Sequence, residues 1–110
     1  ILDYKKALKL NGKLFDMITE LGICFFFKKD FKSATKCFKR TIYKSKNNQA
    51  IGKAYKYLGY TSIEKEEDIS IAVNCFQKSI EFYEKTPFLQ EAPYGDLEFI
   101  YKNIDNRQKS

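Results

Sequence analysis

The stretch that decides the fold is residues 18–38, ITELGICFFFKKDFKSATKCF. It contains an IxxLGxxF element at 18–25 and an AxxxF element at 34–38. Closely related elements return in the same order at 55–62 (YKYLGYTS) and at 72–76 (AVNCF). The two Leu-Gly pairs lie 37 residues apart and the two AxxxF elements lie 38 apart. Two separate elements that recur together at nearly constant spacing indicate an internal repeat.

Each repeat is predicted to form two helices, because apolar residues recur at helical spacing in both of its halves. In the first repeat the polar stretch 28–30, Lys-Lys-Asp, separates the two halves. Asp30 is placed to cap the second helix, since a carboxylate before a helix accepts hydrogen bonds from its first backbone amides. Asp68 has the same position in the second repeat.

Small residues mark the predicted contact between the two helices of a repeat. Gly22 and Ala34 fall where the helices would cross, and a large side chain there would push the two backbones apart. The surrounding core positions are assigned to Leu21, Phe25 and Phe38. One such helix pair cannot bury its apolar surface alone, so the repeats are predicted to stack.

These elements resemble the signature WxxLGxxY…AxxxF of the tetratricopeptide-repeat (TPR) family, with Ile18 and Tyr55 in place of the Trp. The resemblance implies an all-α superhelical solenoid of antiparallel helix pairs, with about six helices in this chain. It also implies a division of the single domain into units. Residues 1–12 would end a preceding unit, residues 15–48 and 52–86 would form two full units, and residues 94–107 would form an opening or capping helix of a third.

The composition argues against catalysis and against metal or cofactor binding. The chain has no histidine, which removes Ser-His-Asp and Cys-His nucleophile arrangements and every His-containing metal site. Three cysteines are too few for an all-Cys zinc site, and the five glycines are too scattered for a phosphate-binding loop. We therefore expect a chain that is not an enzyme and that carries no metal and no cofactor.

The charge and cysteine content limit partners and location. The net charge of +6 is compatible with an acidic peptide, nucleic acid or membrane surface, but lysine-rich helix faces are usually only solvated. No apolar run is long enough to cross a membrane. An odd number of cysteines with no C-x-x-C pair favours a reducing, cytoplasmic location. We expect no membrane partner and no nucleic acid bound directly by this chain.

In TPR proteins the first helix of each unit lines a concave groove, so the resemblance also implies a binding surface. The helix after residue 15 has more apolar residues than one packing face requires. These extra apolar residues could line the groove. The alternative is that Ile23, Phe26 and Phe27 are core residues, because most apolar stripes on helices are buried. A groove with an apolar floor and a basic wall would suit a protein or peptide ligand, including an acidic one. The predicted peptide-binding residues are Thr19, Ile23, Phe26, Phe27, Lys53, Lys56 and Tyr60.

Two functions remain open at the level of sequence. One is a protein–protein interaction module, which acts as a scaffold in a larger assembly. The other follows from the long repeat spacing and from residues 48–59, which loosely resemble the TPR domains of bacterial peptide-sensing regulators of the Rap and PlcR type. That resemblance implies the peptide-sensing domain of a transcriptional or phosphatase regulator. The exposed ends of a solenoid also offer a route to a homo-oligomer.

Overall fold

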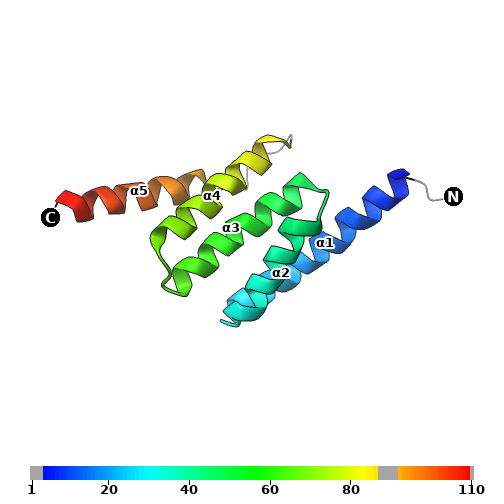
Figure 1. The fold of residues 1–110 in the computed structure, drawn as a ribbon, viewed down its shortest axis with the longest axis horizontal. Helices are drawn as coiled ribbons and strands as arrows, with labels where there is room; N and C mark the ends of the chain where they lie inside the picture. Colours follow the sequence, from blue (N-terminus) through cyan, green and yellow to red (C-terminus); the bar gives the residue numbers. More distant parts are fainter. Residues whose placement is uncertain (1–3, 87–91, 110) are drawn as a thin grey trace.

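A computed structural model describes residues 4–86 and 92–109, and within these ranges every regular element is a helix (Figure 1). The predicted all-α class is therefore confirmed. The molecule is elongated, with extents of 64 × 30 × 18 Å. The helices of the described ranges are α1 (Tyr4–Phe27), α2 (Phe31–Lys44), α3 (Asn48–Glu64), α4 (Ile69–Glu84) and α5 (Tyr94–Lys109).

The predicted caps are confirmed, and the first helix ends in the same way in both hairpins. Asp30 accepts a hydrogen bond from the backbone amide of Ser33 at 3.2 Å, and Asp68 accepts one from the amide of Ser70 at 2.9 Å. Each connection also has a residue with positive φ two positions after the first helix ends, Lys29 at 66° after α1 and Glu66 at 58° after α3. A left-handed residue after the last helical turn is a common way to end a helix. Both first helices therefore end in the same way, although the α3–α4 connection, residues 65–68, is one residue longer than the α1–α2 connection, residues 28–30.

The two hairpins share one packing contact between a glycine and a phenylalanine. A Cβ atom built on Gly22 would lie 2.7 Å from Cε1 of Phe38, and one built on Gly59 would lie 2.6 Å from Cε1 of Phe76. Both phenylalanines are fully buried. The glycines are required because the aromatic ring occupies the space that any side chain would need.

The N-terminal boundary differs from the prediction. α1 continues unbroken through Gly12, where the sequence predicted the end of a preceding unit; residues 1–3 lie outside the described residues. A glycine inside a helix costs only about 1 kcal/mol relative to alanine, which the rest of a long helix can offset. Asn11 also holds this segment in place, because its Oδ1 accepts from the amide of Lys46 at 2.9 Å. The described residues thus contain five helices rather than about six.

One residue and one helix are less buried than the repeat pattern predicted. Leu21, assigned to the core, is 50% exposed because it lies on the side of α1 away from α2 and α3. At the other end, α5 packs on α4 through Leu97 and Ile100 and then extends past the end of α4 (Figure 1). The well-packed part of the fold is therefore the pair of hairpins α1–α2 and α3–α4.

Candidate functional site

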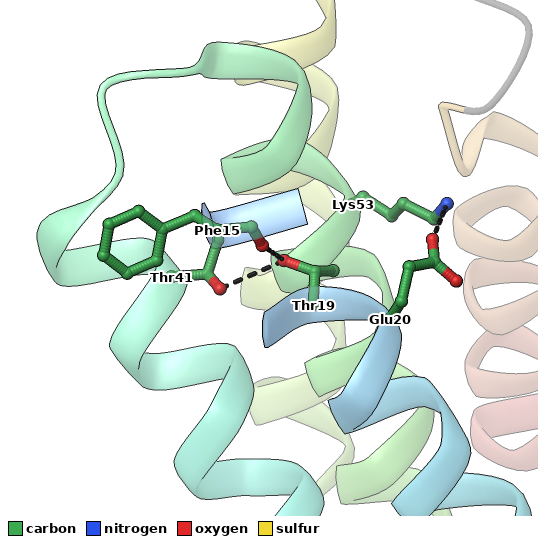
Figure 2. Close-up of polar contacts among 5 residues, drawn as sticks. All are labelled: Phe15, Thr19, Glu20, Thr41 and Lys53. Carbon is green, nitrogen blue, oxygen red and sulfur yellow. Dashed lines mark hydrogen bonds and ion pairs between the residues drawn. The ribbon is translucent and has the colours of Figure 1, made fainter. Parts of the chain in front are cut away.

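Two rows of side chains run side by side along α1 and α3. In each row successive residues are four, three and four positions apart, the spacing that keeps side chains on one face of a helix. An ion pair joins the rows, since Lys53 Nζ donates to Glu20 Oε1 at 2.7 Å (Figure 2). We call this surface the α1–α3 face. Its rows are Asp16, Glu20, Ile23 and Phe27 on α1 and Gln49, Lys53, Lys56 and Tyr60 on α3.

A hollow of about 250 Å³ opens at one end of the α1–α3 face. Most of the side chains around it are polar, and two of them are carboxylates on successive turns of α1. Burial raises the pKa of the Asp16 carboxyl; Lys53 acts in the opposite direction, and Glu20 raises it further. The hollow is lined by Asp16, Thr19, Glu20, Gln49, Ala50 and Lys53.

Two residues of the predicted binding stripe are not available on the surface. Thr19 is 1% exposed at the bottom of the hollow. Its hydroxyl donates to the backbone oxygen of Phe15 at 2.7 Å and lies 3.0 Å from the hydroxyl of Thr41 on α2 (Figure 2). Ile23 is buried in the core with Ala34 and other apolar residues. Thr19 therefore joins α1 to α2, and Ile23 packs against α2 and α3. For Ile23, the alternative that the apolar stripe belongs to the core is right.

The buried threonine pair leads to a stability prediction. Thr19→Val should lower the free energy of unfolding by about 1–3 kcal/mol, because the Thr41 hydroxyl would lose a buried hydrogen-bonding partner. Urea unfolding followed by circular dichroism measures the change. The double variant Thr19→Val/Thr41→Val is the control, and it should cost less than the sum of the two single variants. Additive costs would show that the two hydroxyls do not interact.

The opposite end of the α1–α3 face is aromatic. Phe26 is half-buried, and its ring centroid lies 5.2 Å from that of Phe27 and 5.9 Å from that of Tyr57. Phe27 itself is 71% exposed, so it is a surface residue as the predicted binding stripe requires. Lys56 Nζ lies 5.3 Å from the centroid of the Tyr57 ring, a cation–π distance.

Tyr60 links the face to α5. Its hydroxyl donates to Asp96 Oδ2 at 2.9 Å. Burial of the phenol, and then the hydrogen bond to the Asp96 carboxylate and its negative charge, raise the pKa of Tyr60 well above its ordinary value. The phenol therefore stays protonated and able to donate. Tyr60 is half-buried on α3, in contact with Asp96 of α5 and Phe76 of α4, rather than standing free in a groove.

Sequence reasoning missed the acidic half of the face. It assigned a basic wall to Lys53 and Lys56, but Lys53 is paired with Glu20, and Asp16 lies one turn before Glu20. The signal that could have found them is the spacing itself, because Asp16 and Glu20 lie in the same four-three-four row as Phe27. The face is thus mixed in charge near the hollow and aromatic at the other end.

Among the side chains that the structure describes, no group of acidic, cysteine or histidine residues is arranged to hold a metal ion. None of the described helices combines the length and apolar character needed to cross a bilayer. Comparison of the chain with protein-family models, with curated proteins and with solved structures found no match.

Proposed function

We propose that this chain is a non-catalytic module that binds a protein or peptide on the α1–α3 face, and that its hairpins stack as TPR units do. Support for the stacking comes from three features that occur in both hairpins: an aspartate cap on the second helix, a left-handed residue after the first helix, and the Gly–Phe contact. Surfaces built from the first helices of such hairpins are suited to an extended ligand.

Two of the three cysteines, Cys37 and Cys75, support the non-catalytic part of the proposal, whereas Cys24 is exposed. Burial raises the pKa of the Cys75 thiol to about 11, and burial also raises that of Cys37. The thiolate is the nucleophile, so both groups are poorly reactive near neutral pH. With no histidine in the sequence, the most common general base is also missing.

The observation that carries the binding proposal is the hollow of about 250 Å³ between α1 and α3. It has two carboxylates, Asp16 and Glu20, and a single ammonium group, that of Lys53. Burial already disfavours the charged form of Asp16, so an incoming cation would stabilise that carboxylate. We therefore favour a ligand that places a lysine or arginine side chain in the hollow.

The aromatic end would hold an apolar side chain of the same ligand. Phe27 is exposed, and its ring rests against Phe26, which limits the conformational freedom lost on binding. Exposed aromatic residues supported in this way often contribute much of the binding energy of an interface. The proposed ligand is thus an extended segment with a basic residue at one end and an apolar residue at the other.

Selection of a random peptide phage library on the immobilised chain tests this proposal. We expect the enriched peptides to share a lysine or arginine and a bulky apolar residue. Asp16→Asn and Phe27→Ala should each weaken their binding by about 1–2 kcal/mol, roughly tenfold, as measured by calorimetry.

Glu81→Gln is the matched control, because it also replaces an exposed carboxylate by its amide, but on α4 and away from the α1–α3 face. This variant should bind the selected peptides as the unchanged chain does. Peptides that bind Asp16→Asn and Phe27→Ala undiminished, or no enrichment at all, would rule out the α1–α3 face.

A further inference from the structure

A second surface of α1, which adjoins the α1–α3 face along the side of the helix that carries Glu20, is apolar and exposed. Four large apolar side chains and one thiol follow one another at alternating steps of four and three residues. Every one of them is exposed, although leucine and methionine normally contribute to cores. We call these residues the outer stripe: Leu10, Leu14, Met17, Leu21 and Cys24.

The outer stripe lies across the helix from the residues that hold α1 in the fold. Phe15, Thr19 and Gly22 face α2 and the core, and at 100° per residue their mean direction is about 135° around the helix from that of Leu14, Met17 and Leu21. Alternating three- and four-residue steps are the spacing of a coiled-coil seam, in which each side chain packs between residues of a facing helix. The stripe therefore has the residue spacing of a helix surface that packs against a further helix.

We propose that the helix covering the outer stripe is α1 of a second copy of this chain, packed antiparallel. In one antiparallel register the stripe is complementary to itself. Leu14 then meets Met17 of the partner subunit, and Leu10 meets Leu21 of the partner subunit. The two-fold axis repeats both contacts, as it does in a closed homodimer.

Charge on the flank of the stripe supports this register. Lys13 and Glu20 are seven residues apart, about two helical turns, so both lie on the same flank. Each is exposed. In the antiparallel pairing each lies, along the helix axis, between the Leu10–Leu21 contact and the Leu14–Met17 contact. In the antiparallel register Lys13 therefore faces Glu20 of the partner subunit, and symmetry makes this pair twice. Opposite charges at flanking positions commonly set the orientation of paired helices.

A parallel pairing lacks this match. It would bring the flank that carries Lys13 and Glu20 against the other flank of the partner helix, which carries Ile18 and Phe25. Those two residues are partly buried within their own chain. The charges would then meet apolar groups instead of opposite charges, so the geometry favours the antiparallel dimer.

Sedimentation velocity over micromolar to millimolar concentrations tests whether the 110-residue chain dimerises through this stripe. The unchanged chain should shift from monomer to dimer as its concentration rises, and Met17→Glu should raise the dissociation constant by about a hundredfold or more. Phe99→Glu is the matched control, because Phe99 on α5 is as exposed as Met17, both at 68%. A chain that stays monomeric, or a dimer that tolerates Met17→Glu, would overturn the proposal.

Charge reversal tests the register. Lys13→Glu and Glu20→Lys should each raise the dissociation constant by about tenfold or more, because each places like charges together twice. Mixing the two variants should restore association, since both pairs in the heterodimer again join opposite charges. Circular dichroism checks that Glu20→Lys, which also loses the Lys53 ion pair, stays folded. Mixed variants that associate no better than either variant alone would exclude the antiparallel register.

Discussion

Phe76→Ala is expected to lower the free energy of unfolding by about 3–5 kcal/mol, the range for removing a fully buried aromatic ring. The Phe76 ring fills the space above Gly59 and packs with Ala72 and Ile100. Its centroid also lies 5.4 Å from that of Tyr60. Because α4, α3 and α5 all meet at this side chain, its loss leaves a cavity that no single helix can close. Urea unfolding followed by circular dichroism measures the effect.

Phe99→Ala is the control for this prediction. It removes the same side chain from a position that is 68% exposed, so the expected change is within about 0.5 kcal/mol. Phe38→Ala should behave like Phe76→Ala, because Phe38 occupies the equivalent place above Gly22. If Phe76→Ala and Phe99→Ala cost the same, the Gly–Phe contact is not the centre of the second hairpin.

The sequence predicted the hairpins well because their determinants are local. A carboxylate directly before a helix can accept a hydrogen bond from one of its first backbone amides, and both Asp30 and Asp68 do so. The small residue and the ring that need each other, such as Gly59 and Phe76, belong to neighbouring helices joined by a short turn. The continuous α1 was missed because a glycine is permitted in a helix interior at modest cost.

The surface was predicted less well because helical spacing groups residues on one face without saying what covers that face. Thr19 and Ile23 share a spacing with Phe27, but a helix wedged between two neighbours buries more than one stripe. The Lys53–Glu20 ion pair joins residues 33 positions apart, and no local pattern encodes it. Leu21 was assigned to the core by its position in the repeat, and its exposure depends on which helix lies beside α1.

Gly59→Ala is expected to destabilise the chain by about 1–2 kcal/mol, although the same change in an open helix stabilises it by up to about 1 kcal/mol. The new Cβ would lie 2.6 Å from Cε1 and 2.9 Å from Cδ1 of Phe76, closer than carbon atoms pack. The Phe76 ring is fully buried and has little room to move, so helix backbones must shift to relieve the contact. Thermal unfolding of the variant, compared with the unchanged chain, measures the balance.

Two further variants separate the clash from the helix propensity. Gly95→Ala introduces the same methyl group into α5, where a Cβ would have no neighbouring atom within 4 Å, so stability should stay the same or rise slightly. Gly59→Ala/Phe76→Leu replaces the ring with a smaller side chain that leaves space for the methyl group. If the steric account holds, this double variant is more stable than the two separate costs predict, because the clash counted in Gly59→Ala disappears when the ring is removed. Strict additivity would instead mean that Gly59 is needed for a reason other than the Phe76 ring.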